Sequence, residues 1–153
     1  MSVIKPRFRY DSEFKPEWIT EKIDEEGINY LENLGFYLTD KRAETDNSPG
    51  YSAMTTSQVR NIFGEIKRIQ LQMEGETDPE NEDWQGDFLM LRPKIAYNTA
   101  RVLNQKKDNR IKVFRDVLEM AHKQVSKNKE NFKRFSQFAE AIIAYHKVYG
   151  GRD

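Results

Sequence analysis

Residues 55–75, TTSQVRNIFGEIKRIQLQMEG, carry the clearest structural pattern in the chain. Thr55 and Gln58 are spaced as a capping box, in which two side chains bond the free backbone N–H groups of a helix's first turn. Gly75 supplies a stop signal. Between them, apolar residues recur at the three- and four-residue steps of one helix face: Val59, Ile62, Phe63, Ile66, Ile69 and Met73. This spacing predicts a helix over about residues 56–74.

Helical spacing continues on both sides of this segment. Towards the C-terminus it predicts helices over about residues 86–105, 109–127 and 130–149, with Pro93 kinking the first or opening its main part. Towards the N-terminus, Pro16 can open a short helix, because a first-turn residue needs no N–H bond. The apolar residues expected to face inward in this short helix and the helical piece after it are Trp18, Ile19, Ile23, Ile28, Leu31, Leu34 and Leu38.

Period-two alternation, which is typical of strands, appears only in short snatches such as residues 8–11. The sequence therefore predicts an all-α protein, a single-domain bundle of about five helices with an N-terminal extension. We expect residues 1–53 to form an N-terminal arm and first helical segment, with a loop over residues 40–53. Residues 54–153 are then the core of the bundle, and the length allows one domain overall.

The composition excludes several classes of protein. The 153 residues include no cysteine, which rules out disulfide scaffolds, thiolate metal sites and a thiol nucleophile. No apolar run approaches the roughly 20 residues that cross a bilayer, and the amino terminus lacks the apolar stretch of a secretory signal. The acidic run at residues 74–87 lacks the glycine and final glutamate of an EF-hand loop, so we favour a solvated linker over a calcium site. We expect a cytoplasmic protein without metal, cofactor or membrane contact.

The net charge of zero hides an uneven distribution. Residues 1–91 carry 10 basic and 19 acidic side chains, whereas residues 92–153 carry 15 basic and 6 acidic ones. Such an asymmetry points to contact with nucleic acid or a membrane. Neutrality is therefore no argument against a polyanionic partner.

Several polar and basic side chains gather on a single face of the predicted helix over residues 86–105. They offer phosphate donors, an aromatic plane and amides, with no carboxylate among them: Lys94, Tyr97, Asn98, Arg101 and Gln105. This combination suits a nucleic-acid strand, and an ordinary solvated face is an equally good interpretation of the composition alone. In the last predicted helix, Lys133 and Arg134 lie outside the apolar arc and extend the positive surface with Lys127 and Lys129.

The predicted helix over residues 56–74 also has a basic side. Arg60, Gly64 and Lys67 lie outside its apolar arc, with Arg68 just beyond them, and Leu71 shares their sector. A glycine inside a helix costs about 1 kcal/mol relative to alanine. One reason to keep it is close approach by another backbone, either a neighbouring helix or a sugar–phosphate chain.

Signals for an enzyme are few. The chain has no P-loop, nucleophile elbow, zinc-protease or dinucleotide-binding motif. His146 falls within the apolar arc of the last predicted helix, which favours a packed, hydrogen-bonded histidine. Arg115 and His122 share one helix face at a seven-residue spacing that resembles the motif of HEPN-type ribonucleases. In that alternative, the arginine stabilises phosphate charge and the histidine is the acid or base.

Three segments together resemble a known family. They are residues 54–60 (MTTSQVR), residues 91–101 (LRPKIAYNTAR) and residues 138–149 (FAEAIIAYHKVY), in this order and spacing. They are similar to the small subunit of the type III-A CRISPR effector, the Csm complex, over about residues 54–149. Ala100 departs from the glycine that the family usually has there, and residues 1–53 do not match the family.

The resemblance implies a small helical protein without catalytic residues or a cofactor. It implies that copies stack beside other effector subunits and line the channel that holds crRNA and target RNA, without sequence preference. The basic positions of the matching motifs are implied to contact RNA: Arg60, Lys67, Arg68, Arg92, Lys94 and Arg101. With Tyr97, Lys133 and Arg134 they form our predicted RNA-binding set. A nuclease built on Arg115 and His122, or a helical protein–protein adaptor, is the alternative.

Overall fold

A computed structural model describes residues 4, 8–39, 56–105 and 110–149, without the side chains of Thr56, Gln58 and residues 101–105. Within these ranges the chain forms helices and no strand, which confirms the predicted all-α class. The helices are α1 (Tyr10–Glu13), α2 (Glu17–Thr20), α3 (Glu25–Tyr37), α5 (Thr56–Gly75), α6 (Asp83–Gln105), α7 (Arg110–His122) and α8 (Lys129–Val148).

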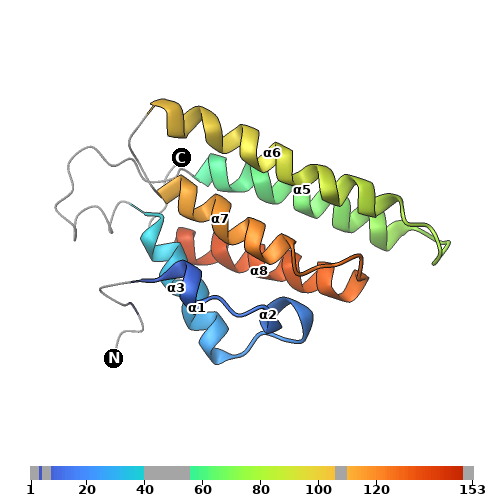
Figure 1. Ribbon diagram of the computed structural model, residues 1–153, viewed down its shortest axis with the longest axis horizontal. Coiled ribbons are helices and arrows are strands. Elements are labelled where there is room, and N and C mark those ends of the chain that lie inside the picture. Colours follow the sequence, from blue (N-terminus) through green and yellow to red (C-terminus); the bar gives the residue numbers. More distant parts are fainter. Residues whose placement is uncertain (1–3, 5–7, 40–55, 106–109, 150–153) are drawn as a thin grey trace.

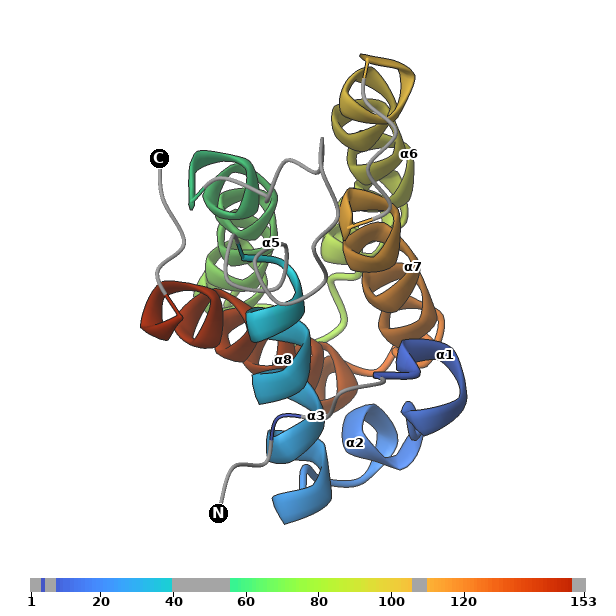
Figure 2. The same ribbon diagram turned by 90° about the vertical axis from the view of Figure 1, so that its left-hand side faces the viewer.

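The bundle is formed by α5, α6, α7 and α8, and the N-terminal helices α1, α2 and α3 cover one side of it. α5 and α6 form an antiparallel hairpin along the top of Figure 1, with α7 below α6 and α8 packed against α5. α3 crosses α8, and α1 and α2 lie beside α3 at the bottom of the view (Figures 1 and 2). α6 therefore lies at the edge of the bundle, farthest from α2 and α3.

The core is filled by the apolar faces that the sequence predicts. Fully buried side chains come from every long helix and from α2 and α3, among them Trp18, Leu34, Ile66, Ile95, Val117, Phe132 and Phe135. Each large side chain removed from water stabilises the fold by about 1.5–3 kcal/mol. The short α2 holds Trp18 and Ile19. Ile23, beyond its end, is 38% exposed and Ile28 in α3 is 37% exposed, so their predicted inward positions are wrong.

α3 and α8 approach each other closely at Gly35. A Cβ atom there would lie 2.5 Å from Tyr145 Cβ and 2.8 Å from the backbone N of His146. Gly35 therefore allows two helix backbones to touch. At Gly64, by contrast, a Cβ atom would meet nothing within 4 Å, so no neighbouring helix among the described residues explains that glycine.

Helix boundaries differ from the predicted ones where tertiary contacts decide them. α6 begins three residues early, because Trp84 joins the core against Phe88 and Phe132, and Pro93 lies inside the helix. α7 ends at His122, five residues before the predicted end, and the chain then turns through Ser126 and Lys127. These two residues have φ angles of 51° and 61°, which lie in the left-handed region and cannot continue a helix.

The N-terminal arm contains a short helix, α1. α1 forms a single turn, and the backbone carbonyl of Tyr10 accepts a 2.7 Å hydrogen bond from the Tyr30 hydroxyl of α3. Gly27 lies in the first turn of α3, where its N–H donates to the Asp24 carboxylate at 2.8 Å. The predicted capping box at Thr55 and the predicted loop over residues 40–53 fall outside the described residues.

Candidate nucleic-acid interface

The exposed side of α6 displays three of the polar side chains that the sequence grouped together. Lys94, Tyr97 and Asn98 line an open hollow of about 390 Å³ with Glu65 and Met90. Tyr97 is 69% exposed, so its ring is available for stacking. Arg101 lies one turn further along α6, and its side chain, like that of Gln105, is outside the described set.

The carboxylate of Glu65, from α5, lines this hollow, and the sequence analysis did not predict this contact. Glu65 accepts hydrogen bonds from Lys94 Nζ and from the Arg68 guanidinium, both at 3.1 Å. These bonds hold the pKa of Glu65 below its usual value, Lys94 contributing first. The polar face of α6 therefore has a carboxylate beside it, because Glu65 forms ion pairs with Arg68 of α5 and Lys94 of α6. All three side chains are at least one-third exposed, and such pairs contribute only about 0–1 kcal/mol.

The outer side of α5 completes this surface. Arg60 and Gly64 are exposed, and Lys67 is half-buried. Leu71 is 59% exposed, so no described part of the chain covers it. The hollow and this side of α5 are named the α5–α6 face below.

Arg92 points away from this face and towards α7. Its Nε donates a 3.1 Å hydrogen bond to Nδ1 of His122, whose Nε2 lies 2.7 Å from the Phe88 carbonyl oxygen. Because a guanidinium can only donate, Nδ1 is the acceptor, and the proton of the neutral ring is assigned to Nε2. The imidazole stacks on the Phe88 ring with centroids 3.8 Å apart and planes 2° from parallel.

The environment keeps His122 neutral. Burial lowers its pKa from 6.5 to about 4, and the neighbouring Arg92 charge acts in the same direction against the opposing bond to Phe88. The side chain is 2% exposed and both ring nitrogens are engaged. Arg115, the other residue of the nuclease alternative, lies with a guanidinium N atom 3.6 Å from an Asp116 oxygen. A buried, neutral imidazole with both nitrogens occupied is poorly placed to exchange a proton with RNA.

The two α8 residues of the predicted RNA-binding set, Lys133 and Arg134, are engaged within the chain. Lys133 lies 3.4 Å from Glu130 on the same helix. Arg134 donates from Nε to the Ile19 carbonyl at 2.7 Å and from a terminal N atom to the Thr20 carbonyl at 3.3 Å. These are carbonyls at the end of α2, so Arg134 ties α8 to the N-terminal helices.

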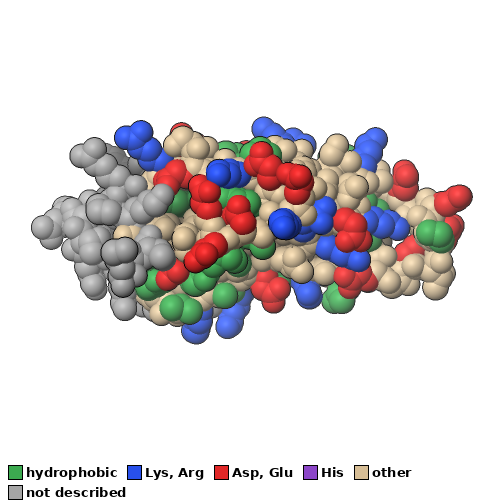
Figure 3. All heavy atoms as spheres, turned by 90° about the horizontal axis from the view of Figure 1, so that it is seen from below, with side chains coloured by type: hydrophobic (Ala, Val, Ile, Leu, Met, Phe, Trp, Pro, Cys, Tyr) green, Lys and Arg blue, Asp and Glu red, His purple; other side chains and the backbone are tan. Residues whose placement is uncertain are grey.

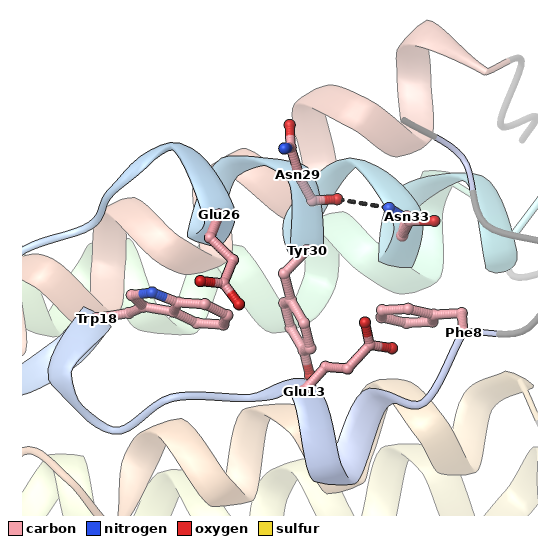
Figure 4. A pocket seen from close by; sticks show the side chains of 7 residues that line it. All are labelled: Phe8, Glu13, Trp18, Glu26, Asn29, Tyr30 and Asn33. Carbon is pink, nitrogen blue, oxygen red and sulfur yellow. Dashed lines mark hydrogen bonds between the residues drawn. The ribbon is translucent and has the colours of Figure 1, made fainter. Parts of the chain in front are cut away.

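α1–α3 display a different chemistry. Residues 8–39 carry three basic and eight acidic side chains. A pocket of about 240 Å³ lies between these helices, lined by the rings of Phe8, Trp18 and Tyr30 and by Glu13 and Glu26 (Figure 4). Seen from this side of the molecule, acidic and basic side chains are interspersed (Figure 3). Carboxylates repel a phosphate backbone, so this side is the poorer candidate for RNA.

The described ranges offer neither a cluster of metal ligands nor a membrane-spanning helix. These ranges contain no group of three or more acidic, histidine or cysteine side chains placed to hold a metal ion. Their helices include none that is long and apolar enough to cross a membrane.

Comparison with known proteins identifies the family. The family model described as Csm2 Type III-A matches residues 37–152. The chain belongs to this family. The resemblance to the small subunit of the type III-A effector is thereby confirmed, and other subunits of that complex are the partners of a Csm2-family chain.

One Csm2 relative is "CRISPR system Cms protein Csm2" of Streptococcus thermophilus. It is 28% identical over 115 residues, which cover 72% of this chain and 84% of the relative. No solved structure matches the chain significantly. The Csm2 match begins at the last residue of α3, so it includes the α5–α6 face and leaves α1, α2 and nearly all of α3 outside.

Proposed function

We propose that this Csm2-family chain is a non-catalytic subunit that lines the effector's channel for crRNA and target RNA. It would contact the RNA backbone without sequence preference. The observation that carries this proposal is the exposed group of Lys94, Tyr97 and Asn98 around an open hollow on α6.

Each of these side chains supplies a contact that tolerates any sequence. An ammonium group such as that of Lys94 neutralises phosphate, and an amide such as that of Asn98 bonds phosphate or sugar oxygens. An exposed ring such as Tyr97 can stack on any base, which is worth about 1–3 kcal/mol per base. An RNA strand that reaches the face has to displace Glu65 from Lys94, which costs little because the pair is solvent-exposed.

The apolar part of the surface suits protein partners. Leu89 and Met90 on α6 are 55% and 56% exposed, and Leu71 on α5 is exposed as well. Apolar side chains exposed beside a polar face are typical of protein–protein contact. We propose that sister copies and neighbouring subunits cover them in the assembled effector.

RNA-binding measurements with the full-length chain test the proposal. Lys94→Ala combined with Arg101→Ala should weaken binding equally for unrelated single-stranded RNAs. The slope of log affinity against log salt should fall by about 0.7 for each lost phosphate contact. The control is Lys112→Ala with Lys147→Ala, which removes two exposed cations of α7 and α8. RNA affinity equal to that of wild type in the Lys94/Arg101 variant would show that the face is wrongly assigned.

The nuclease alternative predicts cleavage, which is measured directly. Labelled RNA incubated with the purified protein should stay intact, because His122 is buried and neutral. Cleavage that disappears in Arg115→Ala would overturn the non-catalytic assignment. For the adaptor alternative, binding to effector subunits would be unaffected by competing RNA.

A further inference from the structure

A second pocket lies on the other flank of α6, between that helix and the end of α7. It has a volume of about 220 Å³. Its walls are Trp84, Gln85, Phe88, Leu89, Arg92, His122, Lys123, Ser126 and Lys127. The residues come from the first part of α6 and from the end of α7 with the turn after it, so side chains 30 to 43 positions apart in the sequence meet in one place.

All the charged side chains that line this pocket are basic. Arg92, Lys123 and Lys127 line it, and no carboxylate does. Lys123 and Lys127 are exposed, and neither makes an ion pair with another described residue. Arg92 also lines the pocket, and its Nε is bonded to His122, so the guanidinium is held there. Three cations without a partner carboxylate form a place for an anion.

The wall also contains the apolar side chains of Trp84, Phe88 and Leu89, and one of them carries an unsatisfied donor. Trp84 is 3% exposed, and its indole N–H has no hydrogen-bond partner among the described residues. A buried donor without a partner costs free energy, typically about 1–3 kcal/mol in proteins. Leu89, at the rim, is 55% exposed. The pocket therefore combines cations with apolar surface, which matches a nucleotide better than a bare inorganic anion.

We propose that this α6–α7 pocket binds one nucleotide of a bound RNA strand, with its phosphate on Arg92, Lys123 and Lys127. The sugar or base lies against the Leu89 side of the wall. Lys123 and Lys127 are thereby RNA-binding residues, and Arg92 acts here rather than on the α5–α6 face.

This inference rests on the proposed function, since it takes RNA as the ligand, but it uses different residues. Lys94 and Tyr97 face α5, whereas Arg92 faces α7. A strand that crosses the outer edge of α6 can reach both flanks of that helix. The two sets of cations can therefore be removed separately.

The test uses two readouts on the full-length protein. The first is the affinity for single-stranded RNA of Lys123→Gln with Lys127→Gln, against Lys112→Gln with Lys147→Gln as a control that removes the same charge. The second is the NMR signal of the Trp84 indole N–H, one of only two indoles in the chain. The control arms for this signal are inorganic phosphate and AMP.

We expect the Lys123/Lys127 variant to bind RNA about tenfold more weakly at low salt, with a salt slope reduced by about 0.7 per lost contact. The control should stay within about twofold of wild type. RNA should shift the Trp84 signal in wild type and in Lys94→Ala with Arg101→Ala. The Trp84 signal therefore tests the pocket even if the α5–α6 face does not bind RNA.

Equal RNA affinity in the Lys123/Lys127 variant and its control would overturn the pocket while leaving the proposed function standing. An unchanged Trp84 signal at saturating RNA would also overturn it. A shift by AMP or phosphate as large as that by RNA, at equal concentration, would show a site for free nucleotide or anion rather than for an RNA strand.

Discussion

Two pockets of nearly equal size, one formed by α1–α3 and the other between α6 and α7, differ mainly in charge. The pocket of α1–α3 has a volume of about 240 Å³ and that between α6 and α7 about 220 Å³, and both have aromatic walls. Glu13 and Glu26 line the first, whereas Arg92, Lys123 and Lys127 line the second. The zero net charge of the chain thus hides an acidic surface at α1–α3 and a basic one between α6 and α7.

The comparison separates the part of the chain that belongs to the family match from the part that does not. The acidic α1 and α2 lie before residue 37, where the Csm2 match begins, and the basic α6 and α7 lie within it. The two regions also differ in packing, since backbones touch at Gly35 while Gly64 faces open space. The N-terminal helices are therefore closely packed and acidic, and the α5–α6 face is open and partly basic.

The largest expected effect concerns the tight crossing of α3 and α8. In Gly35→Ala, the new Cβ atom would overlap Tyr145 Cβ and the His146 backbone. Because backbone cannot move aside as a side chain does, we expect a loss of stability of about 3 kcal/mol or more. Urea denaturation measures it. An unchanged unfolding midpoint would mean that the N-terminal helices are not held close to the bundle.

The next effect comes from His122 at the floor of the α6–α7 pocket. Its pKa is 6.5 when exposed and about 4 in the fold. Above pH 6.5 the histidine is neutral in both the folded and the unfolded chain, so its protonation does not reduce the free energy of unfolding there. As the pH falls towards 4, only the unfolded chain takes up the proton, so stability decreases by about 3 kcal/mol in total.

Denaturation of wild type and His122→Gln between pH 7 and pH 4 isolates this effect. The variant cannot titrate at this position and should lose less stability over that range, even though its absolute stability is lower. Parallel curves for the two proteins would show that His122 is not buried in the neutral form.

A smaller effect of opposite sign is expected at Gly64. An alanine Cβ there meets no atom, so Gly64→Ala should stabilise α5 by about 1 kcal/mol. Thermal denaturation of the isolated protein measures the gain. If RNA affinity falls while stability rises, a sugar–phosphate chain approaches α5 closely; a fall in stability would contradict the open position of Gly64.

The smallest effect tests the acidic region. Glu13→Gln with Glu26→Gln removes two negative charges from the α1–α3 pocket, and both amides can still accept hydrogen bonds. We expect RNA affinity to change less than about twofold at physiological salt, because a charge far from the RNA is screened. A tenfold gain in affinity would show that RNA passes over α1–α3, and the comparison would fail.

The sequence predicted the helices well because their apolar faces are long and periodic. It placed α5 and α8 within a residue or two, since both faces repeat over five turns. It missed the early start of α6 because Trp84 is held by Phe132, 48 positions away. It also missed the end of α7, where two non-glycine residues adopt left-handed backbone angles that no local pattern signals.

The candidate site was predicted less completely, because the use of a charged side chain depends on its distant neighbours. Glu65 lies 29 positions before Lys94, and only the packing of α5 on α6 brings them together. Arg134 looked like a surface cation but bonds carbonyls of Ile19 and Thr20. Lys127 was expected only to extend the positive surface of the last helix, and Lys123 gave no signal beyond the general excess of basic residues. The turn between α7 and α8 brings both to the α6–α7 pocket.

Photo-crosslinking of 4-thiouridine RNA to the assembled effector, followed by peptide mapping, tests the central claim most directly. The account predicts crosslinks to peptides of α6 and of the turn after α7, including those with Tyr97 and Lys127, for any RNA sequence. Crosslinks confined to the peptides of α1–α3 that carry Phe8, Trp18 and Tyr30 would contradict it.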